Sequence, residues 1–136
     1  MTIPATVPPP PPPAPDSVAP VVQNPALADF RISSQEAGIG TCYAETTTTF
    51  SVTVTDDVAA TSVKIAWIAP GGATRTTTLA ASGSTWSGTI GPFPFSEIPP
   101  GDVVKYDVTV TARDAAGNTT VVTLTKFGVV DSCPLP

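Results

Sequence analysis

Two segments that alternate strictly between apolar and polar residues, 103–113 and 119–129, constrain the fold of this chain more than any other feature. Successive side chains of an extended strand point to opposite faces, so the apolar residues of the first segment share one face. They are Val104, Tyr106, Val108, Val110 and Ala112. A short turn containing Asp114, Gly117 and Asn118 joins the two segments. The pattern therefore predicts a half-buried antiparallel hairpin.

Turn residues and short alternating segments recur about every ten residues after Pro25, which is the rhythm of an all-β sandwich. We expect seven antiparallel strands, at 27–33, 47–55, 61–68, 74–80, 84–90, 103–113 and 119–129. Apart from the hairpin residues above, their inward side chains are predicted to be Phe30, Ile32, Phe50, Val52, Val54, Val63, Ile65, Trp67, Trp86, Ile90, Val122 and Leu124. Phe127 falls on the opposite phase of the last strand, which makes that strand the hardest to place.

The first 25 residues differ in composition from the rest. Residues 4–25 contain ten of the 17 prolines, six of them consecutive, and a single charged residue, Asp16. Proline fixes φ and removes hydrogen-bond donors, so this segment is expected to form an extended polyproline II linker that packs on nothing. We therefore divide the chain into a Pro-rich linker, 1–25, and one β-sandwich domain, 26–136.

Charge excludes some partners. The chain has six basic and eleven acidic residues, a net charge of −5 and a pI near 4.3. Nucleic acids and anionic lipid surfaces are bound through Lys and Arg, so neither is expected as a partner. No apolar run has the roughly 20 residues that a membrane span requires, and the N-terminus lacks the pattern of a signal peptide. We expect the chain to be part of a larger protein whose targeting and anchoring segments lie outside it.

The two cysteines, Cys42 and Cys133, are far apart in the sequence, and there is no histidine to complete a zinc site. If seven strands alternate in direction, the second begins and the last ends at the same pole, which places these cysteines side by side. We expect them to form a disulfide, and hence an oxidising compartment. Two free thiols in a cytosolic protein are the alternative.

The absence of histidine also removes the usual general base and the Ser-His-Asp and Cys-His arrangements. A carboxylate pair such as Glu97 with Asp102 could serve a glycosidase, but both residues lie in or beside a Pro-rich turn, where acidic side chains are usually just solvated. The sequence therefore predicts neither an enzyme nor a cofactor.

Acidic and amide side chains gather in two turns predicted to leave the sandwich at the pole opposite the disulfide. Asp56 and Asp57 follow the second strand, and Asp114 and Asn118 form the hairpin turn. Oxygen ligands from adjacent loops suit Ca²⁺, so these four residues are candidate calcium ligands. Asp and Asn are also ordinary turn residues that cap local backbone donors, and that alternative stays open.

Aromatic residues supply the candidate ligand contacts. Trp67 is predicted to be a core indole, whereas Trp86, flanked by Ser and Thr, is either core or a platform for a sugar ring. Phe93 and Phe95 lie in a Pro-rich loop, where they either fold back over the sandwich or stay exposed. If exposed, they would form a contact surface with Tyr43 at the disulfide pole. Long loops on a rigid scaffold often bind ligands, so these three residues are candidate ligand contacts.

The stretch from about Ala26 to Val130 resembles bacterial immunoglobulin-like and fibronectin type III-like domains, chiefly through Gly101-Asp102-Val103 and the Asp114–Asn118 turn. The resemblance implies a Greek-key sandwich in an exported protein. The linker followed by one domain is similar to the extracytoplasmic tails of actinobacterial membrane proteins. We expect a non-catalytic, monomeric module that binds or senses a protein or cell-wall glycan at the cell surface. The alternatives are a passive spacer and a carbohydrate-binding module of an extracellular glycosidase.

Overall fold

The computed structural model describes residues 8–9, 16–34, 45–98 and 101–132. This part of the chain is built from strands and a single 3-10 turn, as the alternating sequence predicts. Their bounds are β1 Val21–Leu27, β2 Arg31–Ser33, β3 Thr48–Thr55, β4 Ala60–Ile68, β5 Arg75–Thr78, β6 Ala80–Ser82, β7 Thr85–Ile90, η1 Phe95–Glu97, β8 Val103–Asp114 and β9 Thr119–Asp131. No helix in these residues has the length and apolarity needed to cross a membrane.

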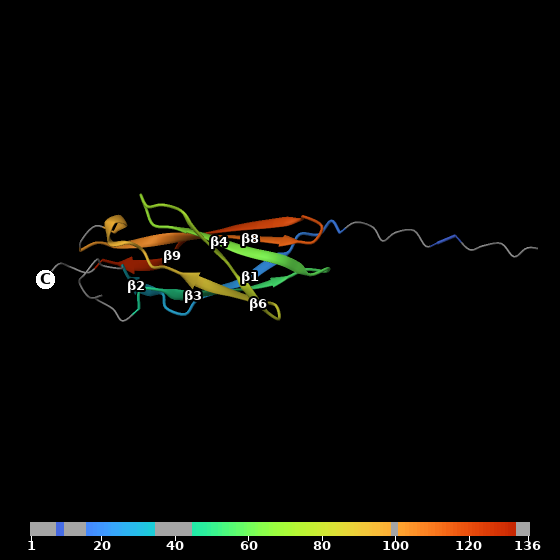
Figure 1. Ribbon diagram of the computed structural model, residues 1–136, viewed down its shortest axis with the longest axis horizontal. Coiled ribbons are helices and arrows are strands. Elements are labelled where there is room, and N and C mark those ends of the chain that lie inside the picture. The colour runs from blue at the N-terminus through green and yellow to red at the C-terminus, as the bar shows by residue number, and fades with distance from the viewer. Residues whose placement is uncertain (1–7, 10–15, 35–44, 99–100, 133–136) are drawn as a thin grey trace, which may run out of the picture.

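The strands form two sheets that pack face to face along the long axis of the molecule (Figure 1). One sheet has the order β1-β3-β7-β6 and the other the order β2-β9-β8-β4-β5. Strand β2 runs parallel to β9, whereas the other strand pairs of the described residues are antiparallel. The all-β prediction is confirmed at this level.

Two segments expected to be single strands instead change sheets. The expected strand 27–33 leaves the first sheet after β1 and enters the second as β2. The expected strand 74–80 leaves the second sheet after β5 and reaches the first at Ala80, where β6 begins, with Leu79 buried at the crossing. Phe30 lies in the first of these crossings and is 59% exposed, so its predicted inward position is wrong. The crossings keep the edge strands short, which limits the unpaired backbone that each sheet offers.

The expected boundary of the Pro-rich linker at residue 25 is corrected by β1. This strand begins at Val21 and pairs antiparallel with β3. Pro25 is tolerated because β1 is an edge strand with a bulge between Gln23 and Ala26, where Asn24 has a φ of 53°. The contacts extend further toward the N-terminus, since the Thr120 hydroxyl donates a hydrogen bond to the Pro20 carbonyl. The part of the linker from Asp16 to Pro25 therefore belongs to the folded body.

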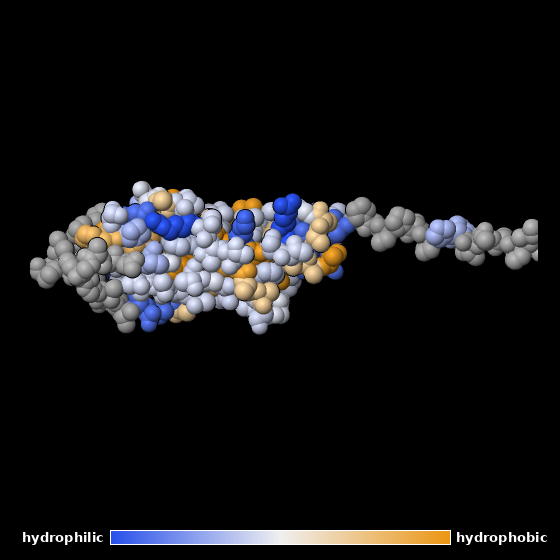
Figure 2. Space-filling view, in the orientation of Figure 1, coloured by the Kyte–Doolittle hydropathy of each residue, from blue (hydrophilic) through white to orange (hydrophobic). Residues whose placement is uncertain are grey.

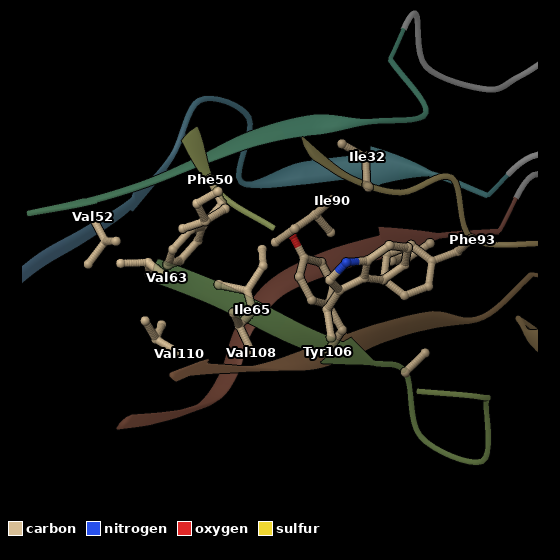
Figure 3. Packing of buried hydrophobic residues seen from close by; sticks show 14 of the residues in the cluster. Ile32, Phe50, Val52, Val63, Ile65, Ile90, Phe93, Tyr106, Val108 and Val110 are labelled. Atoms are coloured by element: carbon tan, nitrogen blue, oxygen red, sulfur yellow. The ribbon is translucent and has the colours of Figure 1, made fainter. Parts of the chain in front are cut away.

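The core lies between the sheets and contains most of the residues predicted to face inward. Figure 3 shows Phe50 and Val52 of β3 pointing toward Val63 and Ile65 of β4 in the other sheet. Burying aliphatic and aromatic side chains of this size stabilises the fold by about 1.5–3 kcal/mol each. The predicted residues that are fully or nearly buried are Ile32, Phe50, Val52, Val54, Val63, Ile65, Trp67, Ile90, Tyr106, Val108, Val110 and Ala112. Trp86, Val104, Val122 and Leu124 pack against this core while partly buried.

The hairpin of β8 and β9 has the predicted turn and an irregularity that explains Phe127. Between Tyr106 and Val108 of β8 the register shifts, and the facing stretch of β9 is two residues longer. Lys126 adopts a φ of 53° there, and its N–H donates to the Asp107 carboxylate at 2.7 Å. The bulge turns Phe127 toward the core, where its ring lies 5.9 Å from that of Phe50.

The outer surface of the sheets is covered mainly by small hydroxyl side chains. In Figure 2 most of the visible face has intermediate hydropathy, with only a few strongly hydrophilic side chains. This agrees with a sequence that has 12% charged residues and 22 threonines. β-branched Thr suits the pleated, half-exposed face of a sheet.

Candidate metal centre

The end of the molecule where β1 begins and β3 and β8 end, here called the N-terminal pole, gathers acidic side chains. Thr55 at the end of β3 pairs with Val21 of β1, and Ala60 at the start of β4 pairs with Asp114. These pairings bring together the loop that follows β3, the turn that follows β8 and the segment that precedes β1. The candidate calcium ligands of the first two segments therefore lie at one place.

A carboxylate that was not predicted from the sequence, that of Asp16, completes the group. One carboxylate oxygen from each of Asp16, Asp56 and Asp57 lies within 4.8 Å of the corresponding oxygens of the other two residues. The carboxyl of Asp114 neighbours those of Asp16 and Asp56, and both influence its pKa. We call Asp16, Asp56, Asp57 and Asp114 the aspartate cluster. The signal for Asp16 was present in the sequence, because it is the one charged residue between positions 4 and 25.

Asn118 positions the cluster. Its backbone N–H and its side-chain Nδ2 donate to the two carboxylate oxygens of Asp114, at 2.8 and 3.0 Å. Nδ2 also donates to the backbone carbonyl of Asp16 at 2.8 Å. Asn118, predicted as a calcium ligand, thus uses its nitrogen atoms to connect the segment before β1 to the β8–β9 turn.

Two oxygen atoms of the cluster are buried without a hydrogen-bond partner, Oδ2 of Asp16 and Oδ2 of Asp56. Their sister oxygens accept backbone N–H groups, from Val18 at 2.9 Å and from Asp57 at 3.0 Å. In the described residues the ion pairs are Arg31–Asp131 and Arg75–Glu97, and neither includes a member of the cluster. Buried carboxylate oxygens require a proton, a donor or a cation, because desolvation without one is costly.

The pKa values of Asp16 and Asp56 are raised, whereas that of Asp114 is lowered. Burial, the neighbouring Asp57 carboxyl and the charge of Asp16 raise the pKa of Asp56 to about 6. The Val18 N–H lowers the pKa of Asp16, but contact with Asp114, burial and neighbouring charges raise it overall. Burial acts to raise the pKa of Asp114, yet hydrogen bonds from Asn118 and contacts with Asp16 and Asp56 lower it to about 2. Closely spaced carboxylates behave in this way because they cannot all ionise without a counter-charge.

The cluster suits a hard divalent cation. Ca²⁺ binds six to eight oxygen ligands, with carboxylates preferred, and accepts irregular geometry. The two orphaned oxygens are available as ligands, and Asp57 is exposed and can add another. A bound Ca²⁺ ion can therefore take the place of the proton shared by these carboxylates and balance the charge of several of them at once.

A cleft of about 320 Å³ opens beside the cluster and shares Asp56 with it. Trp86 of β7 lines this cleft, and its indole is half-buried. The remaining lining residues are Val54, Thr55, Ala59, Ala60, Gly83 and Ser84. The Trp86 side chain packs against the core while partly buried and also borders the cleft, so its role as a sugar platform stays a prediction.

The aromatic contact surface predicted at the opposite pole is corrected. Phe93 is completely buried, and its ring lies 5.0 Å from that of Trp67 and 5.1 Å from that of Tyr106. The loop folds back because burying a phenyl ring in the core removes its apolar surface from water, which is more favourable than leaving the ring exposed. Phe95 is half-buried in η1. Tyr43, Cys42 and Cys133 lie outside the described residues, so the predicted disulfide stays a prediction.

Glu97, considered above as one of a carboxylate pair, has a structural role. It pairs with Arg75 at 2.7 Å and accepts the Ala73 N–H at 2.8 Å. Arg75 holds the pKa of this carboxyl below its usual value. These two contacts of Glu97 hold the β4–β5 turn against the loop before β8.

Comparison with known proteins adds no further candidate, since no protein-family model and no curated protein matches the chain.

Proposed function

We propose that this chain is a non-catalytic, extracytoplasmic module of a larger bacterial protein, and that its N-terminal pole binds Ca²⁺. The order of the strands supports an immunoglobulin-like assignment. The four-stranded sheet β1-β3-β7-β6 has the A-B-E-D order of that Greek-key fold, and the three central strands of the five-stranded sheet, β9-β8-β4, have its G-F-C order. The resemblance to exported bacterial domains supports the location.

The observation that carries the cation site is the pair of buried, unpartnered oxygens of Asp16 and Asp56 within a group of four carboxylates. Turn aspartates that only cap the backbone would use their oxygens on local N–H groups. Here each of these two residues uses one oxygen in that way and leaves the other directed into the cluster.

The cation would connect two parts of the chain. Asp16 belongs to the Pro-rich segment, whereas Asp56, Asp57 and Asp114 belong to the sandwich. An ion shared among them fastens that segment to the sandwich just before β1. The proposed role is therefore a surface module whose attachment to its linker is stiffened by Ca²⁺. The competing role of a ligand-binding pole around Phe93 loses its main support, because that ring is in the core.

Calorimetric titration of metal-free protein with Ca²⁺ tests the proposal. We expect saturable binding with a Kd of about 10⁻⁴–10⁻³ M, as in other extracellular modules. At ten times the Kd, bound Ca²⁺ should stabilise the fold by about 1.4 kcal/mol and raise the Tm by roughly 5 °C. Asp16→Asn should weaken binding at least tenfold, because it removes a ligand from a segment that precedes the first strand.

Asp102→Asn is the matched control, since it removes one exposed aspartate at the other pole and should leave the Kd unchanged. The proposal is wrong if Ca²⁺ produces neither heat nor a change in Tm. It is equally wrong if the two variants weaken binding to the same extent.

A further inference from the structure

The cleft beside the aspartate cluster combines an aromatic ring, apolar side chains and a carboxylate. An indole, Trp86, forms one wall, small apolar side chains form others, and a carboxylate, Asp56, stands at the side facing the cluster. Its volume of about 320 Å³ is at the lower end of the range for small-molecule sites. It is the size of a site for one ring, not for a peptide helix or strand.

The backbone at the rim of the cleft is also unusual. Ala59 adopts a φ of 129°, a region that residues other than glycine seldom occupy. Such conformations persist where the surrounding structure imposes them and are frequent at binding sites. Ala59 lies in the loop that also carries Asp56 and Asp57, so the loop that holds the cluster shapes the cleft as well.

The charge of the pole decides which ligands are compatible. Four aspartates and a net charge of −5 oppose an anionic ligand such as a phosphate or a uronic acid. A neutral sugar ring has a C–H face that packs on an indole and a rim of hydroxyl groups for the polar side. Val54, Ala59 and Ala60 add apolar surface that suits the methyl of an acetamido group.

We propose that this cleft binds one N-acetylated amino sugar of a glycan, with Trp86 against the ring and the sugar hydroxyls completing the ligands of the Ca²⁺ ion. The inference rests on the proposed cation site. With one oxygen from each aspartate, the cluster supplies fewer than the six to eight ligands of Ca²⁺, so positions remain for oxygens that enter from the cleft.

The test uses the full chain and two probes, triacetylchitotriose and cellotriose, which differ in their acetamido groups. Two-dimensional NMR resolves the two indole N–H signals separately. With Ca²⁺ present, triacetylchitotriose should shift the Trp86 signal saturably. The Trp67 signal should not move, because that indole is buried and donates to Thr77 at 3.1 Å. Cellotriose should bind at least about fivefold more weakly, and EGTA should reduce binding of both probes about tenfold or more.

Trp86→Ala should abolish the response to sugar while retaining Ca²⁺ binding, whereas Phe95→Ala, a ring at the opposite pole, should change neither. Because the native protein reports through its own indole, the test does not depend on the folding of either variant. Normal Ca²⁺ binding without any sugar-dependent shift overturns this inference alone, and so does equal affinity for the two probes. Absence of Ca²⁺ binding overturns the proposed function together with it.

Discussion

At the scale of single residues, the same amino acid has different roles according to what faces it. Asp107 and Asp131 are satisfied by a backbone N–H and by Arg31, and they support the strands. Asp16 and Asp56 instead direct an oxygen at other carboxylates. Gly128 shows the same dependence, because a Cβ there would lie 2.3 Å from the Tyr106 ring. The role of each of these residues therefore depends more on the groups that contact it than on its residue type.

The raised pKa of Asp56 predicts how the metal-free protein responds to pH. The folded state binds this proton more tightly than the unfolded chain, whose aspartates titrate near 3.8. The resulting stabilisation is complete below that value and is lost as the pH rises through about 6. Asp16 acts in the same direction. Asp114, with its pKa lowered to about 2, acts oppositely but only below pH 4.

In EDTA we therefore expect the Tm to fall between pH 5 and pH 7, and saturating Ca²⁺ to remove most of that fall, because the ion replaces the proton. Asp56→Asn should flatten the profile in EDTA, whereas Asp102→Asn should leave it unchanged. Thermal unfolding followed by circular dichroism measures both. A Tm that rises over this range in EDTA, or an unaltered profile for Asp56→Asn, would contradict the assignment of the proton to the cluster.

At the scale of strands, alternation allowed most of the fold to be predicted. The expected strands 47–55, 61–68, 84–90 and 103–113 begin and end within one residue of β3, β4, β7 and β8. Each of these strands has one buried face, so apolar and polar residues alternate along it and its position can be predicted from the sequence. The two edge segments change sheets instead, and that choice depends on which neighbour lies across the core. The local sequence pattern does not show where a strand changes sheets, and this is why the inward position predicted for Phe30 was wrong.

The candidate site was predictable only in part, for the same reason. Asp56, Asp57, Asp114 and Asn118 follow strands whose directions are set by the alternation, so their meeting at one pole could be expected. Asp16 precedes any periodic segment, and only the pairing of β1 with β3 brings it there. Phe93 could not be assigned to the core from a loop without a period.

Successive N-terminal truncations test the role of β1 and of the segment before it. Removing residues 1–15 should change neither the Tm nor Ca²⁺ binding. Removing residues 1–20 should weaken Ca²⁺ binding at least tenfold, because Asp16 is lost, with little further effect on the Tm in EDTA. Removing residues 1–27 should also lower the Tm in EDTA by roughly 10 °C or more, since an edge strand and the burial of Leu27 and Val22 are lost.

Circular dichroism and calorimetry on the three truncated chains give these values. A chain lacking residues 1–27 that melts like the full chain would show that β1 contributes little to the fold. Full Ca²⁺ affinity in the chain lacking residues 1–20 would remove Asp16 from the site.

At the scale of the whole molecule, the two ends of the sandwich differ in character. The N-terminal pole holds the aspartate cluster and the cleft. The other pole buries Phe93 against Trp67 and Tyr106 and fixes the turn after β4 through Arg75 and Glu97. Strand β1 begins at the first pole and β9 ends at the second (Figure 1). The chain therefore enters the fold at the end that carries the candidate chemistry.

The most direct test of the cation site is an NMR titration of the isotope-labelled, metal-free chain with Ca²⁺. We expect saturable shifts concentrated in the amides of residues 16–18, 55–59 and 114–118, which are distant in sequence and adjacent at the N-terminal pole. The amides of Asp29, Asp102 and Asp131, three aspartates outside the cluster, should stay unchanged. Shifts spread evenly over all the aspartates, or no shifts at millimolar Ca²⁺, would show that the cluster is not a cation site.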